Sequence, residues 1–84
     1  MRELLKIQIR ITFVEEIQEL HTILNSLKED VVCTRGRICI DGKSILGLMA
    51  IDTSKPFIVE YVVNPNDDAE RLSLINQLQK WIVE

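Results

Sequence analysis

The 84-residue sequence contains too few cysteines and histidines for a disulfide framework or a zinc site. Its two cysteines, Cys33 and Cys39, can close at most one bridge, whereas small disulfide scaffolds use several. A structural zinc ion needs about four ligands, and His21 is the only histidine. We therefore expect buried or half-buried thiols, with a redox pair as the alternative, and neither a metal nor an organic cofactor.

Long apolar runs and blocks of like charge are absent as well. No segment approaches the roughly 20 apolar residues of a membrane span, and residues 1–6 lack the apolar stretch of a secretory leader. The net charge is −3, and the basic residues form no run. These absences argue against membrane insertion and nucleic-acid binding. They predict one cytoplasmic domain, residues 1–84.

The spacing of apolar residues predicts a strand and then a helix at the start of the chain. Apolar residues at positions 5, 7, 9 and 11 alternate with polar ones, as in a half-buried strand. A helical stripe spaced by three and four follows: Phe13, Ile17, Leu20, Leu24 and Leu27. Thr12 and Glu15 have the spacing of a capping box, with Thr12 as the N-cap. The helix is expected to end near Lys28.

The middle of the chain predicts a hairpin, a short helix and a strand. Two apolar segments, Val31–Thr34 and Ile38–Ile40, flank a turn in which Gly36 supplies the permissive backbone. Side chains alternate between the two faces of a strand. The inward face is therefore expected to carry Val31, Cys33, Ile38 and Ile40, and the outward face Cys39. The helix runs from Ser44 to about Ile51, and the β-branched, aromatic segment 57–63 is a strand.

A last helix follows a turn rich in asparagine and aspartate, with Asn66 expected as its N-cap. Its predicted core stripe is Ala69, Leu72, Ile75, Leu78 and Ile82. Trp81 is expected in the core, with a dimer contact as the alternative. The resulting order, β-α-β-β-α-β-α, predicts an α+β open-faced sandwich, in which three helices cover one face of a four-stranded antiparallel sheet.

The segment Gly42–Ala50 carries a family resemblance. It reads GKSILGLMA, a serine placed to cap a helix ahead of a short apolar run. This segment resembles the KSIMGVMS signature of HPr, the histidine phosphocarrier of the bacterial sugar phosphotransferase system. The element order of that family is the one predicted above, so the resemblance extends over nearly the whole chain. It implies an HPr-like fold in a bacterial protein.

The catalytic signature of that family, a loop of the type TGIHARP, is missing. In an ungapped alignment anchored on Ser44, the phosphohistidine position falls on Phe13, and the arginine and proline positions fall on Glu15 and Glu16. Two carboxylates repel an incoming phosphoryl group. We therefore assign no catalytic residue and expect neither enzyme nor carrier activity. The chain is similar in this respect to the catabolite-repression HPr homologue, which lacks the histidine and keeps the serine.

Ser44 and the residues after it remain as a regulatory hypothesis. The resemblance implies that Ser44 is phosphorylated and that the apolar residues Ile45, Leu46 and Met49 dock protein partners. Leu46 and Met49 are expected to be exposed, whereas Ile45, like Leu48, is also a core candidate. The alternatives are that Ser44 only caps the helix and that the sheet and loops cover all four apolar residues.

Three functional hypotheses follow. The first is a non-catalytic, protein-binding member of the HPr family, controlled through Ser44 by an HPr serine kinase and acting on a partner such as a transcriptional regulator. The second is a small interaction domain that forms homo-oligomers. The third and weakest is an active carrier that uses His21, which is otherwise interpreted as a surface histidine.

Overall fold

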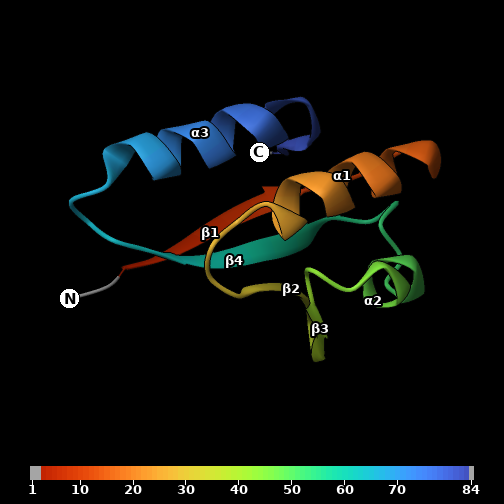
Figure 1. Cartoon of the computed structure of the whole chain (residues 1–84). Helices are drawn as coiled ribbons and strands as arrows, with labels where there is room; N and C mark the ends of the chain where they lie inside the picture. Colours follow the sequence, from red (N-terminus) through yellow and green to blue (C-terminus); the bar gives the residue numbers. More distant parts are fainter. Residues whose placement is uncertain (1–2, 84) are drawn as a thin grey trace.

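The computed structural model describes residues 3–83, which form one antiparallel sheet with helices packed against it (Figure 1). The elements in chain order are β1 (Glu3–Ile9), α1 (Glu15–Asn25), β2 (Val31–Arg35), β3 (Ile38–Asp41), α2 (Ile45–Ala50), β4 (Phe57–Val63), α3 (Asp68–Leu78) and a final 3₁₀ turn, η1 (Gln79–Trp81). The strand order is β1-β4-β2-β3, with every neighbouring pair antiparallel. The predicted α+β class and element order are confirmed.

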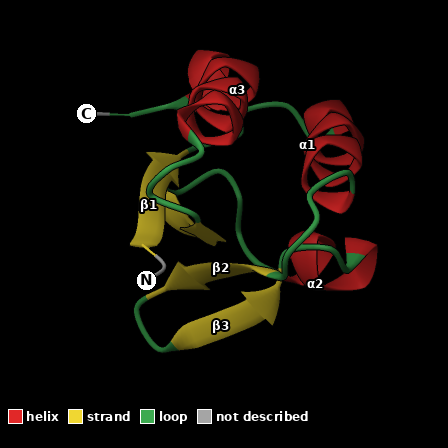
Figure 2. Ribbon diagram, turned by 60° about the vertical axis from the view of Figure 1, so that its left-hand side comes forward, coloured by secondary structure: helices red, strands yellow, loops and turns green. Residues whose placement is uncertain are grey.

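The three helices gather on one side of the sheet and leave the other side open (Figure 2). Strand β4 shows why, because its residues alternate between buried and half-buried along its whole length, so that every second side chain enters the helix-covered core. Trp81 is buried in the same core, as expected. The largest fully buried side chains are those of Tyr61, Phe57, Ile9, Ile11, Leu20, Leu24, Leu48, Leu74 and Leu78.

Helix α1 begins later and ends earlier than predicted. Thr12 is not its cap: the residue before the helix is Val14, and no side chain caps this end. The chain turns outward here because Ile11 is tied to the loop before β4, through its N–H and the Thr53 carbonyl (2.8 Å). Phe13 therefore points to solvent and is not part of the core stripe. The helix ends at Asn25, short of Lys28, with Ser26 bonded back to the Ile23 carbonyl (3.2 Å).

The cap of helix α3 lies one residue after the predicted one. The N–H of Asn66 is already bonded to the Oδ1 of Asn64 (3.0 Å), which holds Asn66 in the preceding turn. The cap is Asp67, whose Oδ1 accepts the N–H of Glu70 (3.1 Å). The macrodipole also favours a carboxylate at this position.

The buried stripe of α3 is rotated from the predicted one. Leu74 and Leu78 are buried, whereas Ala69 and Leu72 are exposed. Contacts at the start of the helix fix this rotation: Glu70 accepts the Tyr61 hydroxyl (3.3 Å) and Arg71 pairs with Glu3. Ile75 and Ile82 are only partly buried, and Ile82 lies beyond the helix, in a β-bridge with Ile9.

The hairpin of β2 and β3 forms as predicted. Gly36 has a φ of 58°, the left-handed conformation that a tight hairpin turn requires. Cys33 is buried and Cys39 is exposed, so the thiols lie on opposite faces of the sheet. Ile38 differs from expectation: it shares the inward parity but is 44% exposed, because it lies at the turn end of the edge strand. Ile40 is partly buried against the core.

Candidate functional site

Ser44 caps α2 as predicted. Its backbone is extended, and its side-chain oxygen accepts the N–H of Gly47 at 3.1 Å. Its carbonyl accepts the N–H of Leu48 at 3.0 Å and so opens the helix. A Cβ at Gly47 would lie 3.4 Å from both the Asp41 carbonyl oxygen and the Cβ of Ile40, which is ordinary van der Waals contact. The short helix therefore packs against the end of β3.

Two cationic residues near Ser44 in the sequence, Lys43 and Arg37, direct their side chains elsewhere or lie farther away. The ammonium of Lys43 donates to the Leu27 carbonyl at 2.6 Å, just beyond the end of α1. Arg37 lies in the hairpin turn, at the end of β3 that is distant from Ser44. The structure brings neither side chain into hydrogen-bond contact with Ser44 among the residues described.

His21 is a half-buried residue on the middle of α1. Its Nε2 lies 3.0 Å from the Lys43 carbonyl oxygen, a contact in which this nitrogen carries the proton and donates. The ring therefore joins α1 to the segment before α2 and does not lie at a helix N-terminus. This geometry supports a packing role for His21 and weakens the hypothesis that it accepts phosphate.

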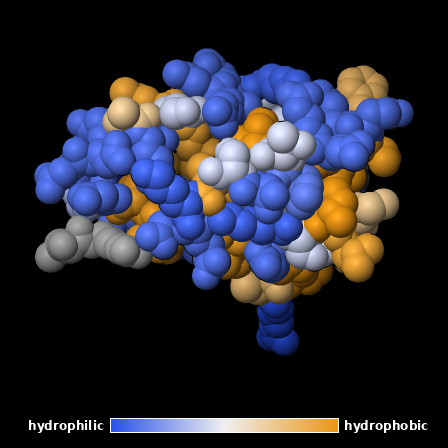
Figure 3. Space-filling model, viewed as in Figure 1, coloured by the Kyte–Doolittle hydropathy of each residue, from blue (hydrophilic) through white to orange (hydrophobic). Residues whose placement is uncertain are grey.

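Large apolar side chains meet solvent where the start of α1 and α2 lie together. Leu46 is 77% exposed and Met49 62% on α2, while Phe13 is 63% exposed and Val14 72% at the start of α1. Ile45 is half-buried beneath them and packs on the core. We call these five residues the apolar surface. Apolar side chains gather at this end of the molecule in the space-filling view (Figure 3, right-hand side).

A groove of about 250 Å³ runs between α1 and α2 within this surface. Its lining residues are Val14, Glu15, Ile17, Gln18, Ile45 and Met49. Val14 and Met49 form its apolar walls, and Glu15 supplies a carboxylate at its side. An apolar side chain from another protein can fill such a groove with Glu15 beside it.

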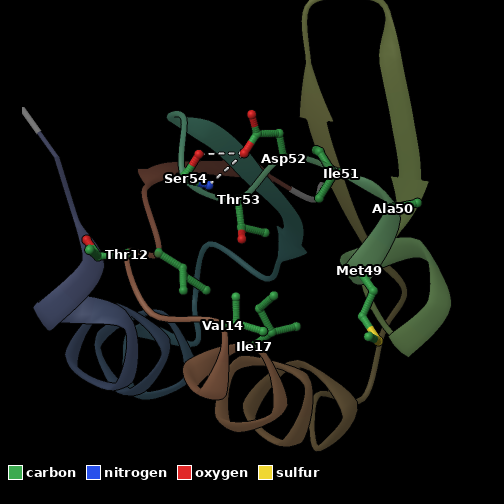
Figure 4. Close-up of a pocket in the computed structure, with 10 residues that line it drawn as sticks. Thr12, Val14, Ile17, Met49, Ala50, Ile51, Asp52, Thr53 and Ser54 are labelled. Atoms are coloured by element: carbon green, nitrogen blue, oxygen red, sulfur yellow. Dashed lines mark hydrogen bonds between the residues drawn. The ribbon is translucent and has the colours of Figure 1, made fainter.

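A second cavity, of about 340 Å³, continues from the groove toward the loop after α2 (Figure 4). In the close-up, Val14 and Ile17 come from α1, and Thr53 faces them from the loop. The polar groups of the loop bond to one another: the Asp52 carboxylate accepts both the N–H and the hydroxyl of Ser54. These bonds hold the pKa of Asp52 below its usual range. The cavity therefore borders the apolar surface at Val14 and Met49 and is polar on the side of the loop.

The start of α1 is acidic. Glu15 and Glu16 occupy its first turn, where the helix dipole favours carboxylates. Lys80 approaches Glu16 at 3.7 Å and Glu19 at 2.7 Å, and its hydrogen bond to Glu19 raises the pKa of Lys80. The ammonium group of Lys80 is thus already paired with the carboxylates of Glu16 and Glu19.

The sequence interpretation missed Phe13 and Val14 as part of the surface. The helical spacing of Phe13 with Ile17 and Leu20 placed it on the core stripe. One feature of the sequence pointed to their exposure. Phe13 and Val14 are adjacent apolar residues before an acidic first turn, and only one of two neighbours on a helix can face the core. Their exposure adds to the apolar face that α2 alone offers.

Within residues 3–83, no group of three or more histidine, cysteine or acidic side chains is arranged to hold a metal ion. In the same part of the chain, no helix has both the length and the apolar character needed to cross a membrane.

No protein-family model matches the sequence, and no curated protein does either. Among solved structures, the chain is similar to HPr-C-His from Thermoanaerobacter tengcongensis, with a TM-score of 0.68 at 11% identity over 92% of this chain and 91% of that one. It is also similar to the phosphocarrier protein HPr from Bacillus anthracis str. Ames, with a TM-score of 0.63 at 15% identity over 92% and 96% of the two chains. The chain therefore has the open-faced sandwich fold of HPr.

Proposed function

We propose that this chain is a non-catalytic relative of the phosphocarriers of the bacterial sugar phosphotransferase system and acts by binding other proteins. One observation carries the proposal. In a fold shared with phosphocarriers, the apolar surface around Val14 and Met49 is exposed. The ungapped alignment anchored on Ser44 adds the sequence expectation that Phe13 lies at the phosphohistidine position. Exposed apolar patches of this kind mark protein contacts.

The charge around the apolar surface specifies the partner. Glu15, Glu16 and Glu19 line the start of α1, so a partner needs an apolar centre bordered by basic residues. An acidic rim disfavours nucleic acid for the same electrostatic reason. An HPr serine kinase and a transcriptional regulator are the two protein classes we propose, both in the cytoplasm.

Phosphorylation of Ser44 is the proposed control. A phosphate there adds a charge of about −1.5 to −2 at the start of α2, directly beside Ile45 and Leu46. The free N–H groups of the first helical turn stabilise such a charge. The added charge changes an apolar surface into an anionic one, which excludes an apolar partner or recruits an arginine-bearing one.

Two labelling reactions test the proposal. Incubation with HPr serine kinase and ATP is expected to add one phosphate, on Ser44, which peptide mapping locates. The Ser44→Ala variant is the control and is expected to remain unlabelled. Incubation with phosphoenolpyruvate and the general enzyme of the system is expected to leave the chain unlabelled. An unmodified Ser44 contradicts the proposed control, and acid-labile phosphate on His21 contradicts the loss of carrier activity.

A further inference from the structure

The two edges of the sheet differ in how far other segments of the chain pair with them. The outer edge of β1 is covered near its end by the last residues: Ile82 forms an antiparallel bridge with Ile9, and the N–H of Val83 donates to the Gln8 carbonyl (3.0 Å). Strand β3 ends the sheet on the other side. Among residues 3–83, no strand pairs with its outer edge, which faces solvent in Figure 2.

The register of the hairpin determines which backbone groups of β3 point outward. Gly42 donates its N–H to the Val31 carbonyl at 2.8 Å. From this pair onward, hydrogen-bonded and non-hydrogen-bonded residue pairs alternate between β2 and β3. Ile38 and Ile40 therefore bond toward β2, whereas the backbone groups of Cys39 and Asp41 point away from it. The Asp41 carbonyl already accepts the Ser44 N–H at 3.0 Å.

This outer edge is short, at four residues, and ends in a charged residue, Asp41, but it lacks the other features that prevent strand addition. Edge strands are protected by being very short, by charged side chains and above all lysine, by proline or by a covering segment. The segment Ile38–Asp41 contains neither proline nor lysine. Ile38 also leaves 44% of its surface exposed on the helix side of the sheet. The edge thus offers the backbone groups of Cys39, the N–H of Asp41 and the apolar area of Ile38 to another strand, while the Asp41 carbonyl already accepts the Ser44 N–H.

We propose that two copies of this chain pair through β3, antiparallel, about a twofold axis that passes Cys39. In this register Cys39 lies opposite the partner's Cys39, and Arg37 lies opposite the partner's Asp41. Ile38 meets the partner's Ile40 on the helix side, which covers its exposed surface. The same patch serves both subunits, as twofold symmetry requires, and the sheet continues through the dimer.

Charge complementarity selects this register over its neighbours. Only shifts of two residues keep outward-pointing backbone groups opposite each other. A shift in one direction places Arg37 opposite the partner's Lys43, and a shift in the other places it opposite the partner's Cys39. Only the register centred on Cys39 pairs opposite charges directly, twice by symmetry, on the open face of the sheet. This inference does not require the proposed function, because neither partner binding by the apolar surface nor phosphorylation of Ser44 enters it.

Sedimentation velocity on the full chain under reducing conditions tests the proposal. A contact this small is expected to give a monomer–dimer equilibrium with a Kd in the micromolar to millimolar range. Arg37→Asp is expected to weaken association about tenfold or more, because it places two carboxylates opposite each other. Arg37 lies in an exposed turn, so this variant is expected to fold normally, which a thermal melt checks.

A charge exchange sharpens the test. Asp41→Arg places two guanidinium groups opposite each other and is expected to be monomeric as well. Mixing the two variants in equal amounts restores opposite charges at both ends and is expected to restore the dimer. Asp41 also accepts the Lys43 N–H (2.9 Å), so crosslinking provides a second readout that does not need this variant.

A short bismaleimide is expected to join Cys39 to the partner's Cys39 in the wild-type protein and much less in Arg37→Asp, with Cys39→Ser as the unreactive control. Three results overturn the proposal: a wild-type protein that stays monomeric up to about 1 mM, a dimer that Arg37→Asp leaves unchanged, or a dimer that does not crosslink at Cys39.

Discussion

Leu46 and Leu48 lie two positions apart on α2 and have opposite environments. Leu48 is fully buried, whereas Leu46 is 77% exposed. Cys33 and Cys39 repeat this contrast in the hairpin, one buried and one exposed. In both pairs the same residue type serves the fold on one side and meets solvent on the other. The difference shows which apolar residues the core requires and which are available for contacts with other proteins.

The exposed members of these pairs lie in the two regions proposed for binding. Leu46 belongs to the apolar surface at the start of α1 and on α2, and Cys39 lies at the free edge of β3. A side chain that remains exposed contributes little hydrophobic stabilisation. Substitutions on the two sides of the same element should therefore separate stability from binding.

The largest expected difference is between the two thiols. Burial, as the main cause, raises the pKa of Cys33 from 9.0 to about 12, which lowers its thiolate population about a thousandfold. Cys39 is exposed. We expect a maleimide at pH 8 to modify Cys39 within minutes and Cys33 only after denaturant is added, as measured by intact mass. Equal reaction of both thiols in the native state would contradict the assignment of their faces.

The next largest difference is between the two leucines of α2. Leu48→Ala removes fully buried methyl groups and leaves a cavity, so the free energy of unfolding should fall by about 2–5 kcal/mol. Leu46→Ala is the matched control, with an expected change within about 0.5 kcal/mol. Urea denaturation of both variants measures the contrast. A large loss for Leu46→Ala would mean that the core, and not a partner, requires this residue.

Removing the cap of α2 should have an intermediate effect. Ser44→Ala leaves the Gly47 N–H without its side-chain acceptor, which costs about 1 kcal/mol of stability. Thr12→Ala, at the cap that the sequence predicted for α1, should change stability by less than about 0.5 kcal/mol, because no side chain caps that helix. Urea denaturation compares them, and equal losses would be inconsistent with the observed start of α1.

The smallest effect is expected at Phe13. Phe13→Ala should leave the free energy of unfolding within about 0.5 kcal/mol of wild type, because the ring is 63% exposed. Ile17→Ala, one turn later and buried, should cost about 2–5 kcal/mol. Thermal and urea unfolding distinguish these outcomes. A cost at Phe13 comparable to that at Ile17 would restore Phe13 to the core stripe.

Local patterns in the sequence were sufficient to predict the element order and the cap of α2. The cap at Ser44 joins residues three apart, and the strand Phe57–Val63 shows its character in β-branched and aromatic residues. The hairpin was equally local, because Gly36 sits between two apolar segments. Such features depend on neighbours in the chain, so sequence alone can identify them.

The predictions that were wrong concern features that depend on contacts between residues far apart in the sequence. The rotation of α3 is set by Glu70 with Tyr61 and by Arg71 with Glu3, two contacts that join the helix to strands β4 and β1. The start of α1 depends on the bond from Ile11 to Thr53. The extent of the apolar surface was missed for the same reason, because that bond turns the following residues outward.

Binding of the chain to HPr serine kinase, measured by calorimetry, tests the role of the apolar surface most directly. Leu46→Ala is predicted to weaken binding about tenfold, the loss of about 1.4 kcal/mol at the contact. Leu72→Ala, which truncates a leucine that is 58% exposed on α3, is predicted to bind as tightly as wild type. Absence of binding by the wild-type chain, or equal weakening by both variants, would contradict the assignment of the apolar surface as the docking site.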